Sequence, residues 1–213
     1  PELADVAAAQ GATLVITHSL APPKQRHHRP QYDDVVSDIK AFLAERVQLA
    51  VDHGLPEDRI VIDPGHDLNK NTLHTLELTR RLTEIADLGL PMLAAVSNKD
   101  FVGEATGLAK SDRMPPSIAA ATICVLNGAR ILRMHDVPAA AAAARMIEAV
   151  LGLRPPAYLP GGRTDHGLGY IHPHPFGDEP ETSGCGPLWP PGRTLRHRVE
   201  QHDWNFAGRG VTS

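Results

Sequence analysis

The sequence contains only two cysteines among 213 residues, and neither has a plausible disulfide partner. Cys124 lies in an apolar stretch that predicts a helix, and Cys185 lies near the end of the chain. A chain without predicted disulfides is typical of a reducing compartment, so we expect a cytoplasmic location. The formal net charge is -4 at pH 7, which gives no basic surface of the kind that binds nucleic acid.

Long apolar runs are also missing from the sequence. No run approaches the about 20 residues that a membrane-spanning helix needs, and no signal peptide is visible at the start. We therefore expect no membrane and no nucleic acid among the partners of this chain. A small-molecule ligand remains as the predicted partner.

The apolar residues follow an order in which short strands alternate with helices. Strands are predicted at residues 13–17, 60–62, 92–96 and 130–132, and a helix over residues 2–10 precedes them. After the first strand, apolar residues recur at spacings of three and four, with Asp33 or Asp34 as N-cap and Gly54 just past the end. The segment from residue 97 to Arg113 is predicted to be a loop. Further helices are predicted between Leu73 and Gly89, between Pro115 and Gly128, and between Pro138 and Gly152.

Four strand–helix units in series predict parallel strands with right-handed crossovers. Four units are half of an eight-unit barrel. We therefore expect an α/β fold, a partial TIM (β/α)8 barrel made of its four C-terminal βα units, over residues 1–160. Because half a barrel leaves two sheet edges unpaired, and because the chain begins at Pro1 inside a predicted helix, we interpret it as a fragment of a longer protein or a truncated reading frame. The alternative is a complete four-stranded α/β domain of the doubly wound type.

The last part of the chain, residues 161–213, has a different composition. Glycine, proline, histidine and arginine dominate there, and apolar residues occur singly. Such a segment buries too little apolar surface to offset its ordering entropy, which predicts a disordered tail. His172, His174 and Cys185 suggest a metal site as an alternative, but paired ligand spacing of the Cys₂His₂ kind is absent from the sequence.

Polar residues follow three of the predicted strands directly. Asp63 follows the second strand, Ser97 and Lys99 follow the third, and Arg133 and His135 follow the fourth. In a TIM barrel, the residues at the carboxyl ends of the strands build the active site. One carboxylate, one ammonium, one guanidinium and one imidazole would then converge on a pocket that suits an anionic, nitrogen-rich small molecule.

Each of these residues also has a simpler interpretation. Asp63 precedes Pro-Gly and is typical of an Asx turn. Lys99 on its own would be a solvated lysine, and Arg133 and His135 could pair with Asp136 at the surface. Their positions at successive strand ends favour one shared site over these separate explanations.

Four motifs in order give the chain a specific resemblance to a known family. They are LVITHSLAPPKQ (14–25), YDDVVSDIKAFLAERVQLAVDHGLPEDRIVIDPG (32–65), SNKDFVG (97–103) and GARILRMHDV (128–137). Over about residues 1–160 the chain resembles the C-terminal half of a dihydropteroate synthase, a pterin-binding TIM barrel of folate biosynthesis. His18 matches the histidine of that family's Met-His-Met stretch.

The resemblance implies a transferase reaction. A hydroxymethyl-dihydropterin pyrophosphate loses pyrophosphate, and the amine of p-aminobenzoate takes its place. Asp63 would accept two hydrogen bonds from the pterin edge, and Lys99 would donate to the pterin carbonyl and ring nitrogen. Arg133 and His135 would hold the leaving pyrophosphate, and Ser97 would bind the same region as Lys99. The catalytic set is therefore Lys99, Arg133 and His135, and the substrate-binding set adds Asp63 and Ser97.

The resemblance also implies Mg²⁺ and a homodimer. In the family, Mg²⁺ is bound with the pyrophosphate by an Asn of an Asn-Val-Thr-Pro-Asp-Ser-Phe segment from the N-terminal half. That segment does not occur in this sequence, so the protein ligand of Mg²⁺ is absent and no metal ligand is assigned. Helices of the C-terminal half form the family's dimer interface, and the small and aliphatic residues of the last two predicted helices suggest such a surface here.

The sequence departs from the family pattern at two places. After Asp-Pro-Gly the family usually has Phe-Gly-Phe-Gly-Lys, whereas this chain has His66, Asp67, Leu68, Asn69 and Lys70. The family's Ser-Arg-Lys is Ser-Asn-Lys here, with an asparagine at position 98. An added acid near the expected p-aminobenzoate site and a lost cation both oppose an anionic second substrate.

Three functional interpretations remain open from the sequence. The first is a dihydropteroate synthase-like transferase that is inactive as this chain. The second is a diverged pterin-binding paralogue with a different second substrate, or a binding or interaction module. The third is a corrinoid-linked methyltetrahydrofolate methyltransferase, although the Ser-x-Lys and Arg-x-His pairs resemble the synthase more closely.

Overall fold

A computed structural model describes residues 2–21 and 30–157 of the chain. They fall almost entirely within a compact unit that comprises Pro1–Pro155. The predictions for residues 161–213, including the alternative metal ligands His172, His174 and Cys185, lie outside the described residues.

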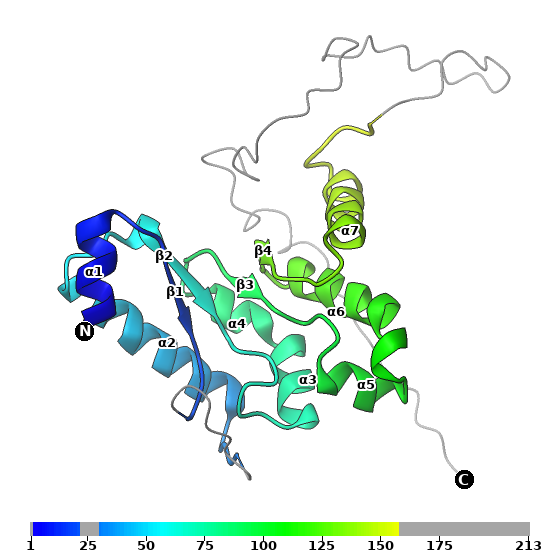
Figure 1. Ribbon diagram of the computed structural model, residues 1–213, viewed down its shortest axis with the longest axis horizontal. Helices are drawn as coiled ribbons and strands as arrows, with labels where there is room; N and C mark the ends of the chain where they lie inside the picture. The colour runs from blue at the N-terminus through cyan, green and yellow to red at the C-terminus, as the bar shows by residue number, and fades with distance from the viewer. Residues whose placement is uncertain (1, 22–29, 158–213) are drawn as a thin grey trace, which may run out of the picture. The chain divides into compact units, whose positions relative to one another are not determined.

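The strands are parallel, as predicted. β1 (Leu14–Thr17) pairs with β2 (Ile60–Asp63), and β3 (Leu93–Ala94) pairs with β4 (Ile131–Leu132). A parallel bridge between Ile62 and Met92 joins β2 to β3, so the strands follow one another in the order of the chain. Their carboxyl ends therefore lie on one side of the molecule (Figure 1).

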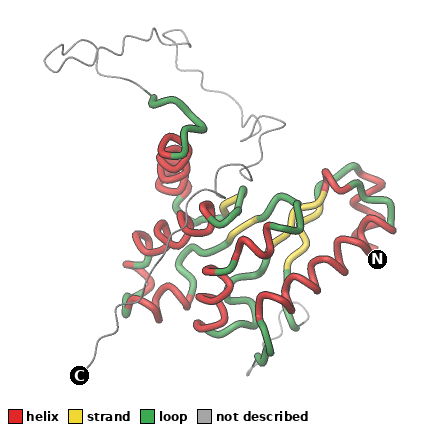
Figure 2. Tube along the Cα trace, turned by 180° about the vertical axis from the view of Figure 1, so that it is seen from behind, coloured by secondary structure: helices red, strands yellow, loops and turns green. Residues whose placement is uncertain are grey.

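Helices follow each strand, as the apolar spacing predicts. The structure contains α1 (Glu2–Gln10), α2 (Val35–Asp52), η1 (Glu57–Arg59), α3 (Thr72–Arg80), α4 (Leu82–Ala86), α5 (Asp100–Thr106), η2 (Lys110–Asp112), α6 (Met114–Leu126) and α7 (Val137–Val150). Asp34 caps α2, because its side chain accepts hydrogen bonds from the backbone N–H groups of Val36 and Ser37. Figure 2 shows the same succession of helices and strands from behind.

Two details of the helix prediction are wrong. The helix predicted between Leu73 and Gly89 is broken at Arg81, which leaves the helical conformation and binds Glu84 and Asp34 with its guanidinium group. The loop predicted up to Arg113 contains the seven-residue helix α5.

The main core lies between the helices and one face of the strands. Ile62 of β2 and Leu132 of β4 pack into it with residues from α2, α4 and α6. A second cluster joins α1 to the start of β2 through Ala4, Ala7 and Ile60. Because side chains alternate along a strand, the residues between these positions project from the opposite face.

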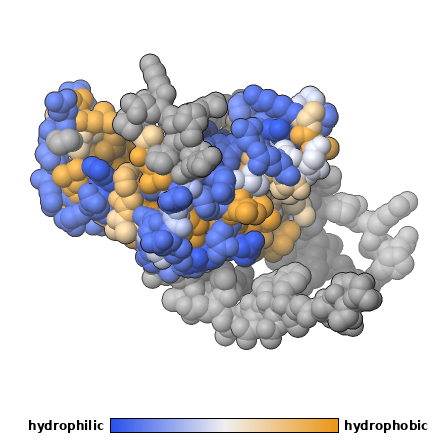
Figure 3. All heavy atoms as spheres, turned by 90° about the horizontal axis from the view of Figure 1, so that it is seen from below, coloured by the Kyte–Doolittle hydropathy of each residue, from blue (hydrophilic) through white to orange (hydrophobic). Residues whose placement is uncertain are grey.

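Some apolar side chains remain on the surface. On α6 and α7 they include Ile123, Leu126, Met146 and Val150. The face drawn in Figure 3 carries apolar patches between hydrophilic side chains. Among the described residues, every helix is too short or too polar to cross a membrane.

Candidate active site

The predicted site residues follow the carboxyl ends of β2, β3 and β4. Ile62 of β2 packs into the helical core, so Asp63, the next residue of that strand, projects from the other face. Arg133 and His135 follow the end of β4 at Leu132, and His135 lines a hollow together with Met134 and residues of α6.

Asp63 is 3% exposed and is held by its own loop. Its Oδ1 accepts a hydrogen bond of 2.8 Å from the N–H of Gly65, which is the Asx-turn contact predicted as the simpler interpretation. The hydroxyl of Thr17 lies 3.4 Å from its Oδ2. The charge of Asp63 also acts on the ammonium groups of Lys70 and Lys99. Asp63 therefore stabilises its own turn and also belongs to a charged cluster with these two lysines.

Lys70 is a buried member of this cluster that the sequence did not single out. Its Nζ lies 2.9 Å from His18 Nδ1, and it donates to the carbonyl oxygens of Gly65 and Leu68 at 2.9 and 3.1 Å. Burial lowers the pKa of Lys70 to about 7, an effect that Asp63 opposes. The only signal in the sequence was that the family's Lys is retained at this position.

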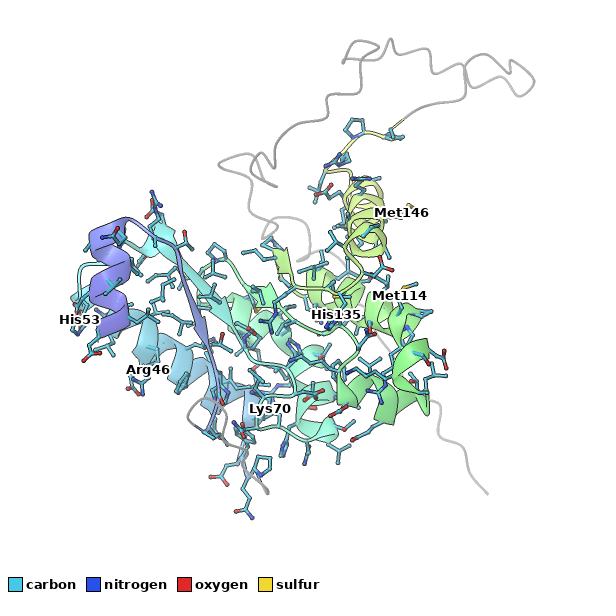
Figure 4. All side chains as sticks on the ribbon, viewed as in Figure 1. Arg46, His53, Lys70, Met114, His135 and Met146 are labelled. Carbon is cyan, nitrogen blue, oxygen red and sulfur yellow. The ribbon has the colours of Figure 1, made fainter. Side chains whose placement is uncertain are left out.

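His18 is a neutral structural partner of Lys70. Burial and the adjacent ammonium group lower the pKa of His18 to about 3, so its Nδ1 acts as an acceptor. Its ring also packs edge-on against Phe42 of α2, with centroids 4.9 Å apart. In Figure 4, Lys70 lies near the end of the β1 arrow, far from His53 beside α1.

Lys99 reaches back from the loop after β3 to the loop after β2. Its Nζ donates to the carbonyl oxygen of His66. Burial lowers the pKa of Lys99 and Arg133 adds to this, whereas Asp67 and Asp63 oppose it. Lys99 is thus within electrostatic range of both Asp63 and Arg133, and their shared role at a substrate site stays a prediction.

Ser97 orients His135. The buried hydroxyl of Ser97 accepts a hydrogen bond from the backbone N–H of His135 at 3.1 Å and lies 2.9 Å from its Nδ1. A hollow of about 410 Å³ lies beside this pair. It is lined by Ser97, Asn98, Met114, Ser117, Ile118, Met134, His135, Asp136 and Pro138. Figure 4 shows His135 beside α6, on the border of this region.

The described residues contain no group of three or more His, Cys, Asp or Glu side chains that could hold a metal ion. Within the site, the imidazole of His135 lies beside the Ser97 hydroxyl, and the carboxylate of Asp63 lies beside the Thr17 hydroxyl and the N–H of Gly65.

Comparison with known proteins identifies the family of this chain. A family model described as pterin binding enzyme matches residues 1–135. This chain belongs to the pterin-binding enzyme family.

Relatives of this chain include proteins named dihydropteroate synthase and inactive dihydropteroate synthase 2. The inactive dihydropteroate synthase 2 of Mycobacterium leprae (strain TN) is 38% identical over 173 residues, which are 79% of this chain and 58% of that protein. The crystal structure of dihydropteroate synthase from Stenotrophomonas maltophilia with active site-bound imidazole has a TM-score of 0.68 at 38% identity, over 71% of this chain and 57% of that one. The Xanthomonas albilineans synthase with 4-aminobenzoic acid has a TM-score of 0.66 at 34% identity, over 72% and 55%. The chain thus spans little more than half the length of these relatives.

The loop after β2 has an unusual backbone at two positions where the sequence comparison leads us to expect glycine. Asp67 and Asn69 have φ angles of 60° and 51°, a left-handed conformation that glycine adopts freely and that aspartate and asparagine tolerate best among other residues. Gly65 has φ 70°, and a Cβ there would lie 2.1 Å from the carbonyl oxygen of His18. The loop therefore has left-handed positions at Asp67 and Asn69 without glycine there.

The side chains of this loop are engaged within the protein. The carboxylate of Asp67 accepts a hydrogen bond from the N–H of Phe101 at 3.1 Å and lies 3.1 Å from the hydroxyl of Thr75. The side-chain amide of Asn69 donates to the Ser19 hydroxyl at 2.7 Å. That Asp67 opposes p-aminobenzoate stays a prediction, since its charge already has protein partners.

Asn98 also has a left-handed backbone conformation. Its φ is 55°, and its N–H donates to the hydroxyl of Ser117 at 2.9 Å. Arg113 donates from Nη1 to the carbonyl oxygens of Asn98 and Lys99, each at 3.3 Å. Arg113 is thus bound to the backbone beside Asn98 and to the carboxylate of Asp100, and Asn98 itself borders the hollow beside His135.

Proposed function

We propose that residues 1–160 form the C-terminal half of a pterin-binding TIM barrel and supply half of the substrate site of a dihydropteroate synthase-type transferase. Residues 161–213 are not part of the proposed half-barrel. Family membership, the parallel βα order and the share of each relative that is covered support the half-barrel assignment.

The observation that supports the functional proposal is the position of Lys99, on which the charges of Asp63 and Arg133 both act. Asp63 and Lys99 would bind the pterin, since a carboxylate accepts paired N–H donors and an ammonium group donates to a carbonyl oxygen. Arg133 and His135 would hold the pyrophosphate that leaves, and Ser97 would orient the imidazole of His135. These groups act through hydrogen bonds and charge, and no step runs through a metal ion held by this chain.

The proposed substrates are a dihydropterin methyl pyrophosphate and p-aminobenzoate. The Xanthomonas albilineans synthase, which binds 4-aminobenzoic acid, supports the second of these by relationship. In a complete barrel, the amine of p-aminobenzoate would displace pyrophosphate from the pterin methylene. The chain alone is proposed to be inactive, because several substrate contacts would have to come from the other half of the barrel.

A chimaera tests this proposal. The N-terminal half of the Stenotrophomonas maltophilia synthase would be joined to this chain, and condensation of the two substrates would be measured by product formation. Asp63→Asn is expected to lower kcat/KM by at least about thirty-fold, because losing one partner of a buried charged hydrogen bond costs roughly 2–5 kcal/mol. Asp58→Asn, at an exposed residue that precedes β2, is the matched control and should leave the rate unchanged. Equal rates for Asp63→Asn and the unchanged chimaera would contradict the proposal.

A diverged paralogue without synthase activity is the second candidate. The relationship to an inactive dihydropteroate synthase 2 favours it, as do the side-chain changes at positions 66–69 and 98. In the same chimaera, His66–Asn69 would be changed to Phe-Gly-Phe-Gly, together with Asn98→Arg. Turnover only after these changes would support the paralogue, whereas turnover by the unchanged chimaera would leave truncation as the only defect.

The proposal also covers the self-association and the cellular location of the protein. We expect self-association through the exposed apolar side chains of α6 and α7. We also expect a reducing cytoplasm, which is supported by the buried free thiol of Cys124.

A further inference from the structure

Asp67, in the loop after β2, makes a hydrogen bond to the start of helix α5. Its Oδ2 accepts from the N–H of Phe101, the second residue of α5, at 3.1 Å. The residue that immediately precedes α5, Lys99, makes no side-chain cap of its own. An acceptor from a distant loop therefore satisfies a backbone donor that would otherwise lack a helical partner.

The same carboxylate also binds α3. The hydroxyl of Thr75 lies 3.1 Å from Asp67 Oδ1, and the N–H of Asp67 lies 3.4 Å from the Thr75 hydroxyl. Thr75 is fully buried, so this contact is anchored in the core. One side chain thus joins the loop after β2 to both α3 and α5.

Lys99 lies at the junction that Asp67 closes. It immediately precedes α5, and its Nζ donates to the carbonyl oxygen of His66, next to Asp67 in the chain. The charges that act on the ammonium group are those of Asp67, Asp63 and Arg133. Asp100 is the other acid beside Asp67, and it raises the pKa of the Asp67 carboxyl in addition to the larger effect of burial.

We propose that Asp67 is a positioning residue for Lys99: its carboxylate ties the start of α5 to the loop after β2, and its charge favours the ammonium group that donates to the carbonyl oxygen of His66 in that loop. The role rests on the proposed function only in making Lys99 a substrate-binding group. It gives the acid at position 67 a role in this chain, since its carboxylate accepts from the N–H of Phe101 and lies beside the hydroxyl of Thr75.

Amine labelling of the chain tests the proposal without any substrate. The full 213-residue chain and its variants would be labelled with trace acetic anhydride between pH 6 and 10, and labelling of each lysine would be followed by mass spectrometry. The exposed Lys110 serves as the internal reference. Amide hydrogen exchange at Phe101 reports on the cap independently.

Two variants separate the charge of Asp67 from its hydrogen bond. Asp67→Asn keeps an oxygen that can accept from Phe101 and tolerates the left-handed backbone, but it removes the charge. Labelling of Lys99 relative to Lys110 should rise roughly two- to ten-fold below the pKa of Lys99, since each pKa unit changes the neutral fraction ten-fold. Asp67→Gly, unstrained at φ 60°, should increase labelling at least as much and accelerate exchange at Phe101 by about five-fold.

The control is Asp58→Asn, which removes an exposed carboxylate from η1 and should change neither readout. If Lys99 labels as in the parent chain in both Asp67 variants, the proposal is overturned. Faster exchange at Phe101 in Asp67→Gly with parent-like labelling of Lys99 in Asp67→Asn would show a purely structural cap and would also overturn it. Because no pterin is used, failure of the proposed function would leave this result intact.

Discussion

Replacing His66 with phenylalanine is expected to make the chain less sensitive to acid. The imidazole is fully buried and stacks on Phe101, with ring centroids 6.4 Å apart. Its Nδ1 has no hydrogen-bond partner among the described residues. Burial, with smaller contributions from Lys99 and Lys70, lowers the pKa of His66 from 6.5 to about 3.

The magnitude follows from the two pKa values. Between pH 6.5 and about 3, the unfolded chain binds a proton at His66 and the folded chain does not. The free energy of unfolding therefore falls as the pH falls, by about 1.4 kcal/mol per unit. From pH 7.5 to pH 5 this amounts to about 2 kcal/mol, and phenylalanine removes it because it has no titrating group.

The assay is urea denaturation followed by circular dichroism at pH 7.5 and pH 5. The stability of His66→Phe relative to the parent should increase by about 2 kcal/mol at the lower pH, whatever offset the larger ring gives at pH 7.5. His18, whose pKa is also about 3, is present in both chains and cancels in the comparison.

The matched control is Cys124→Ala. The sulfur of Cys124 lies 3.9 Å from His66 Nε2, and burial raises the pKa of the thiol to about 12. This substitution disturbs the same part of the core but changes no group that titrates between pH 5 and 7.5. A pH-dependent difference for His66→Phe that does not exceed the one for Cys124→Ala would refute the reasoning.

Two further outcomes follow from the structure. Gly65→Ala should destabilise the chain by more than about 2 kcal/mol in urea denaturation, because a Cβ would lie 2.1 Å from the His18 carbonyl oxygen. Gly107→Ala is the control: this glycine has the same φ of 70° and nothing within 4 Å of an added Cβ. It should therefore lower the free energy of unfolding by only about 1 kcal/mol. Met146→Glu, at a side chain that is 64% exposed on α7, should weaken self-association in sedimentation velocity, and a parent chain that sediments only as a monomer would contradict the proposed interface.

The order of elements could be predicted from the sequence because its signals are local. Asp34 marks the start of α2 and Gly54 lies past its end, as the apolar spacing indicates. Helix α5 escaped prediction because seven residues are too few for a periodic pattern and Gly103 interrupts them. That glycine is explained only by the tertiary structure, since a Cβ there would lie 2.2 Å from the guanidinium group of Arg113.

The positions of the candidate residues at strand ends could be predicted from the sequence, but their contacts could not. Asp63 ends β2 and Arg133 follows β4, as the apolar runs before them indicate. The pairing of Ser97 with His135 and the burial of Lys70 against His18 join residues 38 and 52 positions apart. Such contacts depend on how the strand ends meet, which apolar spacing does not specify.

The left-handed backbone at Asp67 and Asn69 affects how relatives of this chain should be searched for. A pattern that demands glycine at these two positions would reject the chain, although both residues keep torsion angles that glycine favours. A pattern written in torsion angles, with Gly, Asn and Asp as equivalent letters, would retain it. Among more distant barrels, loops of this shape could therefore exchange glycine for polar residues and acquire new side-chain contacts without any change in the path of the main chain.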